Sequence, residues 1–209
     1  NMSHELRTPL NAVIGFSDIL SNETFGSLGN RRYREYAQDI RRSGEHLLEV
    51  VNDILDVGRI EAGEVALQED ETTLAELAAA VRSMVAPGSE RRGIAISIEL
   101  DDQPVLLGDP SKLRRILLNL MSNAVKFSNE GGRVLLTAHC RFDGRLAVAV
   151  TDQGIGIAPD DLPRLGHPFV QVDGSLGRRY EGSGLGLAIA KGLAELHGGG
   201  LTLVSEPGV

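Results

Sequence analysis

Apolar residues recur every three or four positions along two early stretches of the chain, and this spacing restricts the possible folds. The first stretch, ending near Asn22, carries Met2, Leu6, Pro9, Val13, Phe16 and Leu20. The second, from about Arg32 to Ala62, carries Ala37, Ile40, Gly44, Leu47, Val51, Ile54 and Gly58. Such spacing places one apolar stripe on each of two helices. A turn at Asn22–Arg31 and a C-cap at Gly63 complete a predicted helical hairpin. Two helices cannot bury both stripes alone, so we expect a second copy to complete a four-helix bundle.

One histidine of the first predicted helix faces away from the apolar stripe. His4 lies two residues after Met2, about 200° round a helix of 3.6 residues per turn, and Glu5 follows it. A solvent-facing imidazole with a carboxylate base beside it is suited to accept a phosphoryl group. Arg7 and Thr8 follow on the same helical face. Taken alone, the pattern favours an ordinary surface histidine, so the role of His4 depends on the rest of the chain.

Composition excludes several classes of function. The 209 residues carry a net charge of −8, which argues against a nucleic-acid surface. The single cysteine, Cys140, excludes an internal disulfide, and the five histidines lack ligand spacing, so we expect no structural metal. No stretch approaches the ~20 apolar residues of a membrane span, and no signal peptide is apparent, so no membrane contact is expected. The chain starts and stops inside motifs, and we expect a cytoplasmic fragment whose membrane anchor, if any, lies elsewhere.

From Glu64 onward the apolar period changes, and strands and helices alternate without a strict βαβ order. This mixture favours an α/β sandwich over a doubly wound sheet. The predicted strands are Val65–Leu67, Ile94–Ile98, Val134–Ala138, Leu146–Thr151 and Leu201–Val204. The predicted helices are Thr73–Val85, Asp109–Phe127, with Asp109 as N-cap, and Gly184–Leu196. A glycine-rich irregular stretch, 152–183, precedes the last helix.

Three polar side chains share one face of the helix that ends near Phe127. Asn119, Asn123 and Lys126 stand at positions i, i+4 and i+7. Amide oxygens suit hard cations such as Mg²⁺, and a lysine nearby suits phosphate. Taken alone, the same pattern fits a helix with two asparagines facing solvent.

A first glycine motif, D-Q-G-I-G-I at 152–157, directly follows a predicted strand. Asp152 at the strand end can accept a hydrogen bond from an amino group such as that of adenine. Gly154 and Gly156 let the backbone approach a ligand closely. Without further motifs, such a loop is weak evidence of nucleotide binding.

A second glycine motif, G-S-G-L-G-L at 182–187, opens the last helix with Gly182, Gly184 and Gly186. Backbone amides at a helix N-terminus form an anion cradle for phosphates. The strand and βαβ context of a dinucleotide fingerprint are missing, and there is no P-loop sequence. The polar segment between the two glycine motifs has Phe169 as its one strong anchor. It fits a lid over a nucleotide or a surface loop.

The four motifs, in this order, resemble the H, N, G1 and G2 boxes of bacterial two-component sensor histidine kinases. The resemblance covers nearly the whole chain and implies an α+β protein. Residues 1–63 would form the dimerisation and phosphotransfer hairpin, and residues 64–209 a Bergerat-type ATP-binding domain that lacks its C-terminal end. The hairpin sequence F-G-S-L-G-N-R-R-Y-R-E-Y is similar to that of the alphaproteobacterial cell-cycle kinases of the PleC and DivJ type.

The resemblance also implies roles for individual residues. His4 matches the phosphorylated nucleophile and Glu5 its base. Thr8 completes with Glu5 the pattern linked to dephosphorylation of a partner receiver domain. Asn123 matches the Mg²⁺-holding asparagine, with its neighbours Asn119 and Lys126 near the phosphates.

In the glycine-rich region, Asp152 matches the residue that reads adenine. The pocket and lid would be shaped by Gly154, Gly156, Gly182, Gly184 and Gly186. Phe169, Arg178 and Arg179 match lid positions, the arginines near the γ-phosphate. The family usually has a phenylalanine where this chain has Leu165, so a looser lid is expected.

The expected function is therefore an ATP- and Mg²⁺-dependent protein-histidine kinase that acts as a homodimer and passes phosphate to a response-regulator aspartate. Two alternatives stay open. A kinase-dead scaffold would be expected to lose His4, Asn123 or Asp152, and all three are present. An ATPase of the chaperone, gyrase or mismatch-repair type would share the pocket but has no reason to carry the His4 hairpin.

Overall fold

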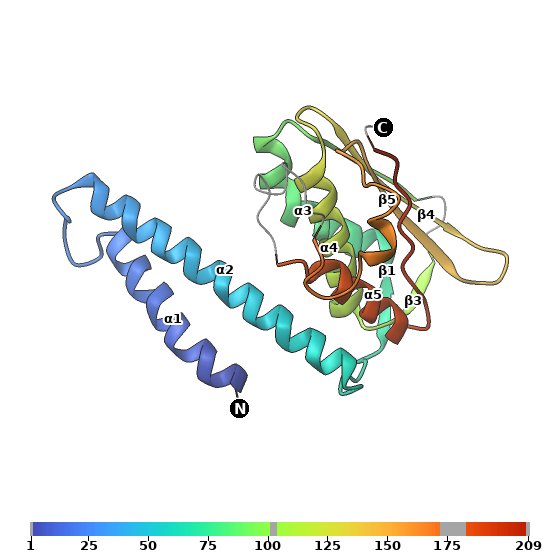
Figure 1. The fold of residues 1–209 in the computed structure, drawn as a ribbon, viewed down its shortest axis with the longest axis horizontal. Coiled ribbons are helices and arrows are strands. Elements are labelled where there is room, and N and C mark those ends of the chain that lie inside the picture. Colours follow the sequence, from blue (N-terminus) through green and yellow to red (C-terminus); the bar gives the residue numbers. More distant parts are fainter. Residues whose placement is uncertain (1, 101–103, 172–182, 208–209) are drawn as a thin grey trace. The chain divides into compact units, whose positions relative to one another are not determined.

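The computed structural model describes residues 2–100, 104–171 and 183–207, with side chains from residue 10 onward. The chain divides into two compact units, Asn1–Arg59 and Ile60–Val209. The first is a helical hairpin and the second a mixed α/β unit (Figure 1). This is the predicted order of architectures.

The hairpin consists of α1 (Met2–Ser21) and α2 (Arg31–Glu61), and the side chains between them are small. Ser17 and Ala37 are buried, and a Cβ added at Gly44 would lie 2.8 Å from Cγ1 of Ile14. Gly44 therefore permits the close approach of the two helices. The large apolar side chains of both stripes, by contrast, are 43% to 67% exposed: Val13, Phe16, Leu20, Ile40, Leu47 and Ile54.

An acidic residue shapes the turn between the two helices. Glu23 has a positive φ of 52°, accepts a hydrogen bond from the Leu28 N–H, and forms an ion pair of 2.8 Å with Arg34. The hydrogen bond from Arg34 lowers the pKa of the Glu23 carboxyl. At the far end of α2, Gly63 has a φ of 68° and donates to the Ile60 carbonyl, as expected of a C-cap.

Among the residues that the structure describes, the second unit has two sheets. The two-stranded sheet pairs β1 (Asp70–Thr73) with β3 (Val105–Gly108), antiparallel. The three-stranded sheet has the order β2-β4-β5, formed by Ala95–Leu100, Arg133–Cys140 and Leu146–Asp152. β4 runs parallel to β2 and antiparallel to β5. The helices are α3 (Leu74–Arg91), α4 (Pro110–Phe127) and α5 (Gly186–Leu196), with a short 3-10 turn at Leu162–Arg164.

The core of this unit lies between α3, α4 and one face of the three-stranded sheet (Figure 1). Along β4, alternate residues Val134, Leu136 and Ala138 are buried against the helices. Both helices begin at strong caps. Thr73 and Glu76 form a reciprocal capping box on α3, and Asp109 caps α4 with proline in its first turn. These local signals fix where the helices start.

Two predicted strands are wrong. Val65–Leu67 is irregular, and the strand of that region is Asp70–Thr73, whose polar sequence gives no apolar alternation because only Thr72 is buried. Leu201–Val204 is also irregular. Its side chains alternate in exposure, but in the described part of the chain no backbone hydrogen bond joins it to a strand.

Two further boundaries differ from the prediction. The helix predicted for Thr73–Val85 continues to Arg91 through Pro87 and Gly88, because Val85 and Ser89 on either side of this pair are both buried. β3 was not predicted, since Val105 and Leu107 are exposed on a strand of only four residues.

Candidate nucleotide-binding site

The C-terminal half of α4 presents the polar face that the sequence predicts. Asn119 donates from Nδ2 to the carbonyl oxygen of Gly186, at 2.9 Å, and so joins α4 to the first residue of α5. Asn123, one turn further along, is partly buried. Among the described residues, its side chain makes no hydrogen bond, which leaves its carboxamide oxygen available for a ligand. Lys126 places Nζ 4.7 Å from the ring centroid of Phe127.

This donor set fits Mg²⁺ only in company with a phosphate ligand. Within the described ranges, no cluster of three or more histidine, cysteine or acidic side chains is placed to hold a metal. A carboxamide oxygen from Asn123 is a hard ligand, and Mg²⁺ sites commonly combine one or two protein oxygens with substrate phosphates and water. The residues therefore fit a metal that arrives with a nucleotide.

Asp152 and Gly154 lie side by side at the end of β5. A Cβ added at Gly154 would lie 2.5 Å from Oδ1 of Asp152 and 2.7 Å from the Phe127 carbonyl oxygen, so only glycine fits. Desolvation raises the pKa of the Asp152 carboxyl, and the Gly154 N–H that donates to it partly opposes the rise. Gly156 is equally constrained, with a φ of 68° and a Cβ position 2.2 Å from the Glu206 carbonyl oxygen.

Backbone hydrogen bonds fasten this glycine loop to the end of α4. The Ile155 N–H donates to the Phe127 carbonyl at 3.3 Å, and the Asn129 N–H donates to the Gln153 carbonyl at 3.1 Å. Ser128 and Gly154 form an isolated antiparallel bridge. The structure thus brings the loop that carries Gly154 to the C-terminal end of α4, as a shared site requires.

The guanidinium group of Arg92 holds the same end of α4, a role that the sequence analysis missed. It donates to the Val125 carbonyl at 2.6 Å, to the Lys126 carbonyl, and to the Ser128 carbonyl at 2.7 Å. These carbonyls lie in the last turn of a helix, where no intrahelical donor reaches them. An arginine 33 to 36 residues away in sequence satisfies them, and no local pattern reveals it.

The second glycine motif lies at the N-terminus of α5. Gly184 has a φ of 71°, and a Cβ there would lie 3.1 Å from the backbone of Phe169 and of Val170. Leu185 is fully buried, and its N–H donates to Ser183 Oγ at 3.3 Å. The N-cap residue of α5 is Leu185, whose side chain makes no cap hydrogen bond, so within the described residues the first amides of the helix are open to an anion.

Phe169 does not form the buried anchor that the sequence suggests. Its side chain is 63% exposed, and its φ is 64°, a conformation that costs energy for a residue with a Cβ. The Phe169 backbone, which has this positive φ, also lies so close to Gly184 that a Cβ there would be 3.1 Å away. The predicted ligand contacts of Arg178, Arg179 and Gly182 lie outside the described residues.

His4, Glu5 and Thr8 lie within the first two turns of α1. They belong to the hairpin unit, whereas the nucleotide-site residues belong to the second unit. The predicted phosphoacceptor and the predicted nucleotide-binding residues therefore lie in different compact units of one chain.

Two family models match the chain. The model described as His Kinase A (phospho-acceptor) domain matches residues 1–63. The model described as histidine kinase-, DNA gyrase B- and HSP90-like ATPase matches residues 108–209. The two matches coincide with the hairpin and with the part of the second unit that holds α4, β5 and α5.

The chain is similar over its whole length to curated bacterial proteins. It is 46% identical to the Non-motile and phage-resistance protein of Caulobacter vibrioides, with 100% of this chain and 25% of that protein aligned. It is 43% identical to Histidine protein kinase DivJ of the same species, over 100% of this chain and 34% of that protein. The chain thus spans about a fifth to two-fifths of the length of such relatives.

Solved structures agree with this assignment. The chain superposes on full-length ShkA in complex with AMPPNP with a TM-score of 0.85 and 38% identity, covering 99% of this chain and 42% of that one. The Acinetobacter baumannii histidine kinase AdeS shares the fold, with a TM-score of 0.68 at 18% identity, over 98% of this chain and 92% of that one. The two family models, which together match most of the chain, and these relatives show that the chain belongs to the sensor histidine kinases.

Proposed function

We propose that this chain is the catalytic core of an ATP-dependent protein-histidine kinase that phosphorylates its own His4. The observation that supports this most is the convergence of three elements around one site. Asn119 of α4 bonds to Gly186 of α5, and Phe127 of α4 contacts the Gly154 loop after β5. A carboxamide face, a carboxylate and a helix N-terminus thus lie together, as adenine, metal and phosphate binding require.

Within this site we assign one task to each group. The carboxylate of Asp152 accepts a hydrogen bond from the adenine amino group. The carboxamides of Asn123 and Asn119, with Lys126 near them, bind Mg²⁺ and the phosphates; when bound, Mg²⁺ neutralises charge on the transferred group. The amides near Gly184 and Gly186 cradle the phosphates. Gly154 and Gly156, which lack side chains, leave room for the adenine ring.

The lid side of the pocket is assigned from the family pattern. Phe169, Arg178, Arg179 and Gly182 form the lid in this proposal, with the two arginines beside the γ-phosphate. Arginine suits this place because its planar, permanently charged fork binds phosphate oxygens in pairs.

The chemical step uses the hairpin. A ring nitrogen of His4 attacks the γ-phosphorus, the new N–P bond forms, and the bond from phosphorus to the β–γ bridging oxygen breaks as ADP leaves. Glu5 accepts the imidazole proton. The phosphoryl group then passes from His4 to an aspartate of a response-regulator receiver domain. A matched receiver is the proposed partner, and ATP as substrate places the core in the cytoplasm.

The hairpin also supplies the proposed dimer. Its large apolar side chains are exposed on both helices, including Phe16 at 67% and Leu47 at 53%. Burial against a second copy, as a four-helix bundle, removes this surface from water. We assign residues 1–63 to dimerisation and phosphotransfer and 64–209 to nucleotide binding. No helix within the described ranges is both long and apolar enough to cross a membrane.

The test is incubation with γ-labelled ATP of the wild-type chain and of two variants, His4→Ala and Asn123→Ala. Acid-labile label on the wild type, absent from both variants, is the expected result. Label that persists on His4→Ala contradicts the assignment of the nucleophile. Nucleotide binding without any acid-labile protein phosphate would instead favour an ATPase, and neither binding nor label would favour a scaffold.

A further inference from the structure

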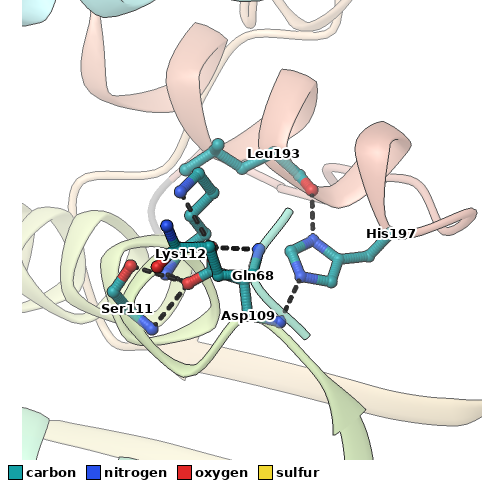
Figure 2. Close-up of polar contacts among 6 residues, drawn as sticks. All are labelled: Gln68, Asp109, Ser111, Lys112, Leu193 and His197. Carbon is teal, nitrogen blue, oxygen red and sulfur yellow. Dashed lines mark hydrogen bonds and ion pairs between the residues drawn. The ribbon is translucent and has the colours of Figure 1, made fainter. Parts of the chain in front are cut away.

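A buried polar network lies at the N-terminus of α4, at the opposite end of the helix from Lys126. Asp109 is 2% exposed, and its carboxylate accepts five hydrogen bonds (Figure 2). The donors are the Ser111 N–H at 3.0 Å and hydroxyl at 2.7 Å, the Lys112 N–H at 3.1 Å and ammonium at 2.8 Å, and the Gln68 N–H at 3.1 Å. Burial raises the pKa of Asp109, but these donors outweigh it and hold the pKa well below its ordinary value.

His197, which directly follows α5, is tied into the same network. Its Nδ1 lies 2.8 Å from the Leu193 carbonyl oxygen, and its Nε2 lies 3.1 Å from the Asp109 backbone nitrogen. A carbonyl oxygen only accepts and a backbone N–H only donates. The proton is therefore on Nδ1, and Nε2 accepts, which defines one neutral tautomer. Figure 2 shows the His197 ring between Leu193 of α5 and Asp109 at the start of α4.

The imidazole lies over a glycine. A Cβ added at Gly108 would come within 3.1 Å of Leu113 Cδ1, 3.2 Å of His197 Cδ2 and 3.4 Å of its Nε2. The last residue of β3 therefore leaves room for the ring to reach the Asp109 N–H. Gly108 does not need a left-handed backbone, so its role is this close approach.

Two polar ties thus join α4 and α5, one at each end of α5. Asn119 bonds to Gly186 at the start of the helix, and Asp109 bonds to His197 just beyond its end. Between them, Ile189 and Leu193 supply buried apolar contact. Apolar contact is not directional, whereas hydrogen bonds require a defined geometry. The two ties therefore fix how α5 is rotated and shifted along α4.

We propose that His197 and Asp109 are positioning residues for the nucleotide. They act through α5, a rigid helix of 11 residues, about 16 Å long. By fixing its C-terminal end, they set where its N-terminal amides at Gly184 and Gly186 lie relative to Asn123. The inference rests on the proposed function, because it supposes that phosphates bind between these groups.

The experiment compares His197→Leu with His197→Gln in the full 209-residue chain. Leucine keeps the volume of the ring but removes the acceptor, whereas the Gln side-chain oxygen can reach the place of Nε2. The affinity for AMPPNP is measured by calorimetry and the melting temperature in parallel. We expect His197→Leu to weaken binding about 10- to 100-fold, because displaced amides lose hydrogen bonds to the charged phosphates, and His197→Gln to restore most of it.

Two controls make the result specific. His139→Leu removes an exposed histidine of β4 and should bind AMPPNP as the wild type does. Gly108→Ala keeps the imidazole but crowds it, and should weaken binding in the same direction as His197→Leu. In the wild type, NMR of the ring nitrogens should show Nδ1 protonated and Nε2 bare, a readout that does not depend on the stability of a variant.

The outcomes separate the two proposals. Unchanged AMPPNP affinity in His197→Leu, an equal loss in Leu and Gln variants, or a protonated Nε2 in the wild type each overturns the positioning role. A wild-type chain that does not bind AMPPNP overturns the proposed function instead. If His197→Leu does not fold, the positioning role is still tested by two measurements. These are the tautomer of His197 in the wild type and the AMPPNP affinity of the His197→Gln and Gly108→Ala variants.

Discussion

The described residues that the hairpin of α1 and α2 buries are mostly small, whereas the core between α3, α4 and β4 includes large side chains. Gly44, Ser17 and Ala37 line the hairpin interior, while Met121 and Leu136 fill the second unit. The hairpin leaves its largest apolar side chains exposed, and the second unit encloses most of its own. A core that is complete within one chain suits a unit that binds a small molecule. An exposed stripe suits a unit whose core is completed by a partner.

The largest expected effect tests the self-sufficient core. Met121→Ala removes a side chain that is 1% exposed and should lower the free energy of unfolding of the second unit by about 2–5 kcal/mol. Denaturant titration of this unit measures it. The matched control is Leu107→Ala, at 72% exposure, which should change stability by less than about 0.5 kcal/mol. Equal losses in the two variants would mean that this core is not closed.

A charge on the hairpin stripe tests the shared core. Phe16→Glu should weaken self-association by about 10- to 100-fold, because each large apolar side chain buried in an interface contributes about 1.5–3 kcal/mol. Sedimentation velocity measures the dimer, and nucleotide affinity should not change. Phe142→Glu, fully exposed on the second unit, is the control. If the dimer persists in Phe16→Glu but is lost in Phe142→Glu, the dimer interface lies on the second unit and not on the hairpin.

Asp152→Asn should separate binding from stability within the second unit. Losing a hydrogen bond to a charged group costs about 1.5–3 kcal/mol, so AMPPNP affinity should fall about 10- to 100-fold. Because the folded protein raises the Asp152 pKa, the ionised carboxyl destabilises the fold at neutral pH, and stability increases as pH falls through the raised pKa. The Asn variant should therefore not melt below the wild type at pH 7, and any advantage should shrink on acidification. A lower melting temperature at pH 7 would contradict this.

The smallest expected effect concerns Thr8, which follows His4 by one turn of α1. Its hydroxyl can orient a water near the phosphoaspartate of a docked receiver without contacting ATP. Thr8→Ala should therefore retain autophosphorylation within about twofold and lose phosphatase activity, a change in balance rather than in the chemical step. Both rates are measured with a cognate receiver. A parallel loss of both, or a fall in melting temperature that explains them, would leave Thr8 a structural role in the helix.

What the sequence predicts well is what local chemistry determines. The start of α4 is fixed by the Asp109 cap and Pro110, and its polar face by the spacing of Asn119 and Asn123. The hairpin follows from its two apolar stripes, and the sequence places its turn and C-cap correctly.

What it predicts poorly depends on partners far away in the chain. β1 is a polar strand that exists because β3 pairs with it, 35 residues later. The hydrogen bond from the Asp109 N–H to His197 joins residues 88 apart in the sequence. Arg92, which follows the last residue of α3, caps the C-terminal end of α4. Phe169 shows the same limit: its side chain is 63% exposed despite its apolar character, and its backbone lies close to Gly184, 15 residues later in the chain.

The irregular segment 201–206 has a practical consequence. Its Ser205 hydroxyl accepts the Ile157 N–H at 2.9 Å, and the Glu206 carbonyl lies against Gly156. Residues 205 and 206 thus contact the loop to which we assign adenine binding, so a displacement of this segment is expected to displace that loop. Attaching the protein to a surface through this segment, as in a surface-based binding assay, is therefore expected to change the affinity being measured. A site on the exposed β4–β5 turn, at Asp143, avoids that coupling.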